Sequence, residues 1–250
     1  MTQTFKDHFS NVAKNYAAYR PQYPSELYTW LASISPDQQL AWDCACGTGQ
    51  ASLGLAERFQ QVIATDASEQ QIAAAQAHPQ IEWRVAPAEA SGLANSSVDL
   101  ITIAQALHWF DLDKFYAEAQ RVLKPEGVLA VWTYGVLKVD EPRIDALVQN
   151  FYSDIVGPYW PPERAIVETG YKDLPFPFKE FAAPAFNMQL HSNKAQLMGY
   201  LRSWSATDRY IKTHEMDPVS HLELQLASLW DNETSYLTEW PLAFRIGRKA

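Results

Sequence analysis

The sequence contains no apolar run near the ~18 residues that a membrane-spanning helix needs, and its longest apolar stretches, such as residues 128–132, have the length of a strand. The polar first residues, MTQTFKDHFSNVAK, hold no apolar segment of the kind that secretion signals carry. Only two cysteines are present, and Cys44 and Cys46 are too close together for a useful structural disulfide. We therefore expect a cytoplasmic protein with no membrane partner.

Positive charge is also scarce, because 20 lysines and arginines face 29 aspartates and glutamates, which gives a net charge of −9. Such a chain lacks the overall positive field with which nucleic-acid-binding proteins neutralise phosphates, so we expect no nucleic-acid partner. The apolar fraction of 47% over 250 residues suffices for a full core and excludes a disordered or collagenous chain. Since no repeat, low-complexity tract or flexible linker divides the sequence, we expect one core with an inserted cap.

Short apolar runs alternate with helix-like segments over the first part of the chain. Strands are expected at residues 40–44, 62–65, 81–85, 98–103 and 128–132, and helices at residues 50–59, 68–78 and 112–123. Farther on, we expect helices around residues 144–155, 193–204 and 218–230, and strands at residues 178–190 and 240–249. This order predicts an α/β fold in which a parallel sheet carries helices on both faces. Ligands of such sheets bind at the carboxyl ends of the strands.

A glycine turn, Asp43-Cys44-Ala45-Cys46-Gly47-Thr48-Gly49, follows the first expected strand. Such a turn lets a ligand approach the backbone closely, and it also occurs in dinucleotide sites. Ser52 stands where the dinucleotide fingerprint has its third glycine, and the Asp43 carboxylate would repel a diphosphate but attract a cationic amine. No P-loop sequence is present, and the two cysteines lack the Cys/His pair that a zinc site would need, so no metal is expected. A nicotinamide-dependent oxidoreductase remains the competing interpretation.

An acid and two further loops follow the next three strands. Asp66 stands nineteen residues beyond Gly47 and can accept hydrogen bonds from both ribose hydroxyls of an adenine nucleoside. It could instead cap a helix, but Ser68 is better placed to do so. The loop at residues 86–89 could reach an adenine or be an ordinary connection. The loop at residues 105–111 exposes histidine and aromatic side chains, and His108 could act in the chemistry or be structural.

These segments in combination resemble the class I S-adenosylmethionine-dependent methyltransferases. The resemblance rests on Asp43-x-x-Cys46-Gly47-Thr48-Gly49, on Asp66, on Ala88-Glu89 and on residues 121–129, RVLKPEGVL. Within that superfamily the chain is most similar to the trans-aconitate methyltransferase-like (methyltransferase type 11) branch, through residues 16–24, residues 105–111 and the aromatic cap. The resemblance implies a Rossmann-like fold with a mostly parallel seven-stranded sheet, helices on both faces and an aromatic-rich cap.

The resemblance also implies the cofactor and the site residues. S-adenosyl-L-methionine would be the cofactor and S-adenosyl-L-homocysteine the product. The expected cofactor-binding residues are Asp43, Gly47, Thr48, Gly49, Asp66, Ala67, Ala88, Glu89, Gln105 and Tyr16. The expected substrate-binding residues are Tyr19, Arg20, Trp109, Trp160, Tyr200 and Arg202, and His108 is the one expected catalytic residue.

The whole chain, residues 1–250, is expected to form a single methyltransferase domain. Its expected parts are an N-terminal lid (1–24), a cofactor-binding core (25–135), two cap insertions (136–177 and 191–238) and two closing strands (178–190 and 239–250). We expect a monomer or a homodimer that acts on a small molecule.

The acceptor is expected to be a carboxylate, which is already ionised at neutral pH and needs no general base. A guanidinium would bind it, and Arg20, Arg164, Arg202 and Arg209 are candidates. A phenol or an alcohol would instead require a base, for which His108 is available. A protein that binds the cofactor without turnover is a further alternative.

Overall fold

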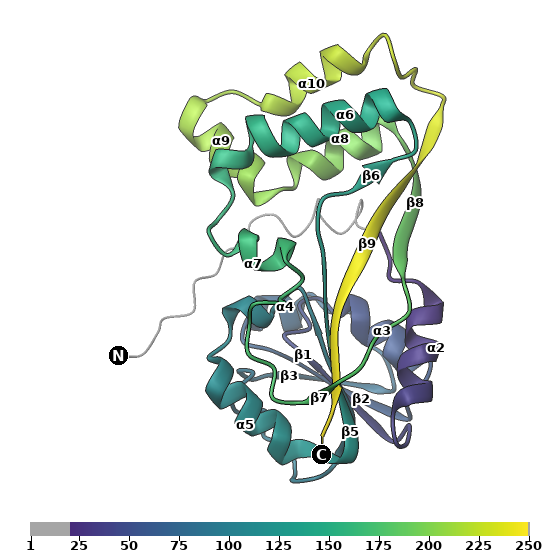
Figure 1. Ribbon diagram of the computed structural model, residues 1–250, viewed down its shortest axis with the longest axis vertical. Coiled ribbons are helices and arrows are strands. Elements are labelled where there is room, and N and C mark those ends of the chain that lie inside the picture. Colours follow the sequence, from purple (N-terminus) through teal and green to yellow (C-terminus); the bar gives the residue numbers. More distant parts are fainter. Residues whose placement is uncertain (1–20, 250) are drawn as a thin grey trace.

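The computed structural model describes residues 21–249 and shows a lower lobe that holds the core and an upper lobe that holds the cap (Figure 1). Five parallel strands form the centre of the lower lobe: β1 (Leu40–Cys44), β2 (Gln61–Asp66), β3 (Ile81–Val85), β4 (Val98–Ala104) and β5 (Leu123–Tyr134). Their order is β3-β2-β1-β4-β5, so the chain adds strands on one side of β1 and then on the other. The strand order thus reverses between β1 and β4, where sheets of this kind bind their ligands.

Helices cover both faces of this sheet. Leu27 of α2 (Ser25–Ile34) and Leu55 of α3 (Gln50–Ala56) pack with Ala41 on one face. Phe115 of α5 (Leu112–Val122) packs with Trp42 on the other face. Successive residues of a strand point to opposite faces, so neighbouring residues of β1 serve two separate clusters. The predicted Rossmann-like α/β class is confirmed.

The strand β9 (Ser235–Arg248) runs antiparallel to β5 and extends upward into the cap. It also pairs with β6 (Lys138–Val139), β7 (Lys179–Glu180) and β8 (Asn187–Asn193), so the sheet has nine strands rather than the expected seven. The count differs because β6 and β7 have two residues each and carry no alternation that a sequence pattern could show.

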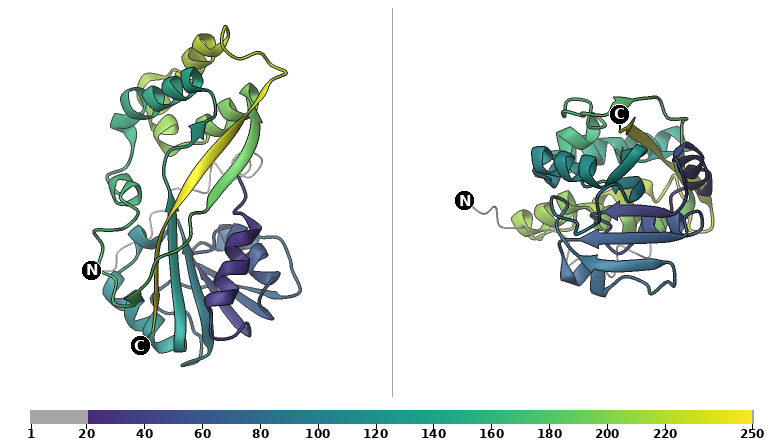
Figure 2. Two further views of the ribbon diagram at one scale, coloured as in Figure 1. Left: turned by 45° about the vertical axis from the view of Figure 1, so that its right-hand side comes forward. Right: turned by 90° about the horizontal axis from the view of Figure 1, so that it is seen from below.

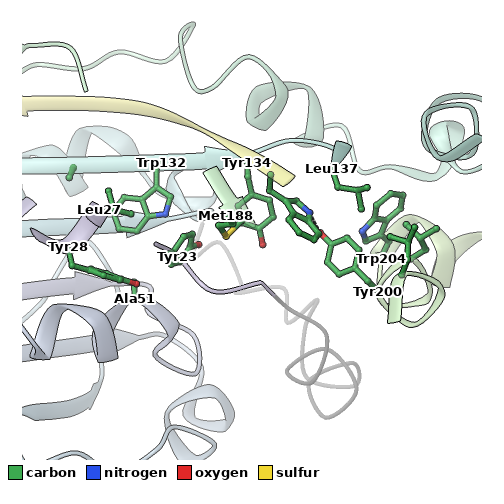
Figure 3. Packing of buried hydrophobic residues seen from close by; sticks show 14 of the residues in the cluster. Tyr23, Leu27, Tyr28, Ala51, Trp132, Tyr134, Leu137, Met188, Tyr200 and Trp204 are labelled. Carbon is green, nitrogen blue, oxygen red and sulfur yellow. Dashed lines mark hydrogen bonds between the residues drawn. The ribbon is translucent and has the colours of Figure 1, made fainter. Parts of the chain in front are cut away.

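The cap consists of helices packed above the carboxyl ends of the parallel strands (Figure 2). It contains α6 (Pro142–Asn150), α8 (Lys194–Arg202), α9 (Ser205–His214) and α10 (Pro218–Leu226), and the short α7 (Arg164–Glu168) lies between the two lobes (Figure 1). Asn193 and Gln196 form a capping box at the start of α8. A buried cluster runs from Leu27 and Trp132 in the core to Tyr200 and Trp204 in the cap (Figure 3), so the lobes share one apolar interior.

One helix is much shorter than its sequence predicts. Helix α4 (Glu69–Ala73) stops well before residue 78, although the Ser68 hydroxyl caps it by accepting a hydrogen bond from the Gln71 amide. None of its residues is buried. An alanine- and glutamine-rich helix that buries no residue fully gains little beyond propensity, which does not sustain a longer helix in water. Within residues 21–249, no helix has both the length and the apolar character needed to cross a bilayer.

One carboxylate lies deep inside the sheet. Asp43 of β1 is 1% exposed. Its Oδ1 accepts a hydrogen bond from the Thr102 hydroxyl at 2.8 Å, and its Oδ2 accepts one from the Ser52 hydroxyl at 2.5 Å. Burial raises the pKa of Asp43 from 3.8 to about 6, although both hydrogen bonds oppose that change. The folded chain therefore binds a proton at Asp43 more tightly than the unfolded chain does.

The stabilising contribution of Asp43 should be fully present below pH 3.8 and be lost as the pH rises through about 6. We expect Asp43→Asn, which cannot ionise, to gain ~3 kcal/mol of unfolding free energy relative to the wild type between pH 4 and 7. Urea unfolding at several pH values measures this difference. Thr102→Val removes a hydrogen bond that lowers the pKa and should steepen the pH dependence. Parallel pH profiles of Asp43→Asn and the wild type would contradict the assignment.

Candidate functional site

The glycine turn after β1 depends on two left-handed glycines. Gly47 has φ +57° and Gly49, which caps α3, has φ +89°. A Cβ on Gly49 would stand 2.1 Å from the ring of Trp83 in β3, so only glycine fits under that indole. Ala45 adopts φ +55° in the same turn, a conformation that costs a residue with a Cβ about 1 kcal/mol. The turn is therefore a strained segment held by its surroundings.

Asp66 ties this turn to the end of β2. Its Oδ2 accepts a hydrogen bond from the Gly47 amide at 2.9 Å, and its Oδ1 accepts one from the Ser68 amide at 2.9 Å. The Cys46 amide donates to the Thr65 carbonyl at 2.9 Å. The structure thus brings the predicted turn and the predicted acid into direct contact. Asp66 is partly exposed at this edge, whereas Asp43 is buried beneath the turn and acts on its surroundings through its charge.

The loops after β3 and β4 meet in the same way. Glu89 Oε1 accepts a hydrogen bond from the amide of Asp111, the residue that caps α5, at 2.9 Å. Ala88 beside it is buried. Among the other predicted cofactor-binding residues, Thr48 and Ala67 are exposed on the first two loops.

Gln105 begins the loop after β4 in a strained conformation with φ +59°. Its amide donates to the Trp132 carbonyl at 3.0 Å, and its Nε2 donates to the Tyr134 carbonyl at 2.9 Å. Both contacts attach the residue to the end of β5. Its Oε1 accepts no hydrogen bond from any residue between 21 and 249, so it is available to a ligand at the sheet edge. Strain of this kind is common at binding sites.

His108 lies beside Tyr171, which follows α7. The His108 Nδ1 and the Tyr171 hydroxyl are 2.8 Å apart. Burial lowers the pKa of His108 to about 4. The nearby Glu163 raises this pKa and Arg164 lowers it, each by less than burial does, so the imidazole is neutral at physiological pH. Burial also raises the pKa of Tyr171, whose hydroxyl keeps its proton and can donate it to Nδ1. In that tautomer the ring proton sits on Nε2, which then cannot accept another proton. The ring of Trp109, 42% exposed, packs on the imidazole with centroids 4.5 Å apart.

The predicted substrate-binding residues of the cap are not all at one place. Trp160 belongs to an aromatic cluster with Tyr152 and Trp204, at centroid distances of 5.2 and 5.5 Å. Tyr200 is buried, and its hydroxyl accepts a hydrogen bond from the Trp240 indole at 3.0 Å. Arg202 is engaged elsewhere, in ion pairs with Asp217 at 2.8 Å and Glu223 at 3.2 Å. The predicted Tyr16, Tyr19 and Arg20 lie outside the described residues.

Two structural partners were missed by the sequence analysis, Trp83 over Gly49 and Tyr171 against His108. No motif marks either residue. The glycine that precedes Tyr171, Gly170 with φ +65°, is a weak sign of a special turn.

The charges of the four loops favour a cationic nucleoside. Residues 43–49, 66–68, 86–89 and 105–111 contain acids but no lysine or arginine. A diphosphate would meet no side-chain cation there, whereas a sulfonium and an ammonium would lie near Asp43, Asp66 and Glu89. The partly exposed Asp66 carboxylate can still accept hydrogen bonds from hydroxyl groups. No group of three or more histidine, cysteine, aspartate or glutamate side chains in the described part of the chain is arranged to hold a metal ion. The residues present thus fit S-adenosylmethionine.

Comparisons with known proteins agree with this chemistry. A family model described as a methyltransferase domain matches residues 42–131, which include the first four loops. A Dictyostelium discoideum protein described as a methyltransferase is 34% identical over 222 residues, which make up 88% of this chain and 84% of that protein. An uncharacterized methyltransferase of Mycobacterium tuberculosis is 35% identical over 126 residues, 50% of this chain and 51% of that protein.

The match to a solved structure extends over core and cap together. A protein described as a type II methyltransferase from Anaeromyxobacter dehalogenans is 44% identical, with a TM-score of 0.88 over 92% of this chain and 98% of its own. The chain belongs to the methyltransferase family, and within it to the class I enzymes that use S-adenosylmethionine.

Proposed function

We propose that this methyltransferase transfers its methyl group to a carboxylate oxygen of a small molecule, as a member of the trans-aconitate methyltransferase-like branch. The observation that supports this assignment of the site is the hydrogen bond from the Gly47 amide to Asp66, which joins the turn and the acid that one nucleoside would contact. Family membership gives the nicotinamide-dependent oxidoreductase no support.

The bound cofactor would supply an electrophilic methyl group on a sulfonium. Asp66 accepts the ribose hydroxyls, Gly47, Thr48 and Gly49 line the methionyl part, and Ala67, Ala88 and Glu89 border the adenine. Asp43 attracts the ammonium through its charge, and Gln105 lies near the sulfonium. The chain's main contribution is to hold donor and acceptor in line, because a direct displacement at carbon depends on positioning.

The pKa of His108, which burial lowers to about 4, makes the imidazole a weak base and agrees with an acceptor that needs none. A carboxylate is ionised at neutral pH, so no proton has to be removed. A histidine whose Nδ1 accepts from Tyr171 positions the loop and the Trp109 ring, and we propose this role in place of proton abstraction. A phenol or alcohol acceptor would require the opposite tautomer.

We further propose how the chain is divided into parts. Residues 1–24, with Tyr16, Tyr19 and Arg20, would form a lid, residues 25–135 the cofactor-binding core, and residues 136–177 and 191–238 the cap. In place of the expected closing strands at 178–190 and 239–250, the chain has the shorter β7 and β8 and the longer β9. The whole would act as one domain, as a monomer or a homodimer in the cytoplasm, on a small molecule rather than a nucleic acid.

Asp66→Asn should weaken the binding of S-adenosylhomocysteine by about 10- to 100-fold, because a hydrogen bond to a charged acceptor is lost for each ribose hydroxyl that it held. Isothermal titration calorimetry measures the affinity. Asparagine keeps one oxygen for a backbone amide, so the fold should persist. Glu69→Gln removes an exposed acid from the neighbouring first turn of α4 and serves as the matched control. An unchanged affinity of Asp66→Asn would refute the ribose role.

His108→Asn should lower kcat less than about tenfold, since general-base catalysis contributes about 100- to 10,000-fold and the proposed reaction uses none. Methyl transfer from labelled S-adenosylmethionine to trans-aconitate and other small carboxylates, followed from pH 5 to 8, tests this. The wild type should show no rise from this histidine, whose pKa lies at about 4. A parallel series of phenols tests the alternative. A loss of 100-fold or more, with phenols as acceptors, would establish a base and overturn the carboxylate proposal. Tight binding of S-adenosylhomocysteine with no transfer to any acceptor would favour a binding protein without turnover.

A further inference from the structure

Arg164, the first residue of α7, is enclosed by aromatic rings. Its guanidinium carbon lies 4.8 Å from the ring centroid of Trp160 and 5.4 Å from that of Tyr152. The side chain is only 18% exposed. A guanidinium is less strongly hydrated than an ammonium and stacks well on rings, so this enclosure suits arginine specifically.

One edge of the guanidinium is fixed by the protein. Its Nε donates a hydrogen bond to the Tyr152 hydroxyl at 2.8 Å and lies 3.6 Å from Glu168 Oε1. The Tyr152 hydroxyl in turn donates to Glu168. These contacts orient the planar group through Nε and leave its terminal nitrogens uncommitted.

Three hydrogen-bond donors at and beside the Arg164 guanidinium have no acceptor in the described part of the chain. Neither Nη1 nor Nη2 of Arg164 has a hydrogen-bond partner among residues 21–249. The indole Nε1 of Trp160, whose ring stacks on the guanidinium, is buried and also unpartnered within that part of the chain. Leaving the buried indole N–H without an acceptor is costly, whereas the unpaired Nη1 and Nη2 of Arg164 are open to solvent. Together they offer donors to an acceptor group brought by a ligand. A guanidinium fork matches the two oxygens of a carboxylate.

The other described candidate arginines are already in use. Arg202 is bound by two carboxylates and is 39% exposed. Arg209 donates from Nη1 to the Tyr159 carbonyl at 3.4 Å. Arg164 is therefore the one of these three whose fork remains available.

The segment that carries Arg164 is attached to the proposed methyl-transfer site. The Val167 carbonyl accepts a hydrogen bond from the hydroxyl of Thr133, near the carboxyl end of β5, at 3.1 Å. Tyr171 contacts His108 in the loop after β4. One residue of α7 and one residue that follows it thus touch the sheet edge, and α7 lies between core and cap (Figure 1). The charges of Arg164 and Glu163 both affect the pKa of His108, which agrees with the position of α7 beside the loop after β4.

We propose that Arg164, together with the Trp160 indole N–H, binds a second, non-reacting anionic group of the acceptor and thereby selects acceptors with two or more carboxylates. This inference rests on the proposed carboxylate acceptor. The reacting carboxylate loses its charge as its oxygen bonds to the methyl carbon and the carbon–sulfur bond breaks. A cation bound to that group would stabilise the starting state more than the transition state and slow the step. A cation bound to a carboxylate that stays ionised stabilises both equally, so the Arg164 fork is useful only away from the reacting oxygen.

The test compares dicarboxylates with their half-esters. Fumarate and trans-aconitate are assayed against monomethyl esters of the same acids with wild type, Arg164→Lys, Trp160→Phe and the surface control Arg143→Lys, whose side chain is 69% exposed. Arg164→Lys keeps the charge but loses the fork. It should lower kcat/KM for the acids by about 10- to 100-fold, mainly through KM, and change the half-esters little. Trp160→Phe keeps the ring, loses the N–H and should shift the same ratio in the same direction. Arg143→Lys should leave the ratio unchanged.

A binding experiment separates this inference from the proposed function. Titration of fumarate and trans-aconitate into the protein saturated with S-adenosylhomocysteine measures anion binding without turnover, and each variant is first checked for unchanged affinity for S-adenosylhomocysteine. If carboxylates are methylated but Arg164→Lys keeps the wild-type ratio of acid to half-ester, the anchor is wrong and the proposed function stands. If the acids bind in an Arg164-dependent manner without being methylated, the anchor stands and the proposed acceptor is wrong. If the loaded wild type binds none of these acids, the anchor is overturned.

Discussion

A single strand belongs to both lobes, and its backbone hydrogen bonds set the cap over the sheet. Residues 242–248 of β9 pair with β5 in the core, whereas residues 235–241 pair with β8, and two of them also pair with β6 in the cap. Fourteen residues at about 3.3 Å each span about 46 Å, and the strand runs from the core into the cap (Figure 1). Pro241, which has no amide hydrogen, stands where the strand changes partners, so the missing donor interrupts neither ladder. The cap is consequently held in place by the sheet itself rather than by a linker.

Two acids of the core, Asp43 and Asp66, lie in very different environments. Asp43 is enclosed between β1, β4 and α3, and although it accepts hydrogen bonds from Ser52 and Thr102, burial dominates and its pKa rises. Asp66, one strand over, ends at the open edge and receives two backbone amides. The first therefore serves as a buried source of negative potential, and the second as a hydrogen-bond acceptor that a ligand can share. Sequence spacing alone does not distinguish these roles, because both acids follow or end an apolar strand.

The sequence predicted the parallel core well and the cap poorly, for physical reasons. The bounds of β1 and β3 agree with the expected residues for two different reasons. β1 is a buried run that ends at a turn, whereas β3, at the edge of the sheet, is marked by the alternation of apolar and charged residues in Ile-Glu-Trp-Arg-Val. The closing strand begins at Ser235 rather than near residue 240, since its first residues pair with β8 outside the core and carry no apolar run. The contact of Gly47 with Asp66 follows from neighbouring strands ending at one edge. The contact of His108 with Tyr171 joins residues 63 apart in the sequence and depends on how the segment after α7 packs, which no local pattern encodes.

The negative charges of the core loops and the positive charge of Arg164 lie in different parts of the molecule. The loops of the core carry acids without a lysine or an arginine, and the aromatic enclosure on the cap side carries Arg164. For the reaction that we propose, donor and acceptor approach with opposite charges and leave with neither. Water stabilises separated charges and so resists that cancellation, whereas an enclosure of tryptophan and tyrosine rings does not. In the reaction that we propose, the rings of the cap would exclude the solvent that holds the reacting groups apart, and the stacked guanidinium would supply the polar recognition that an apolar enclosure alone lacks.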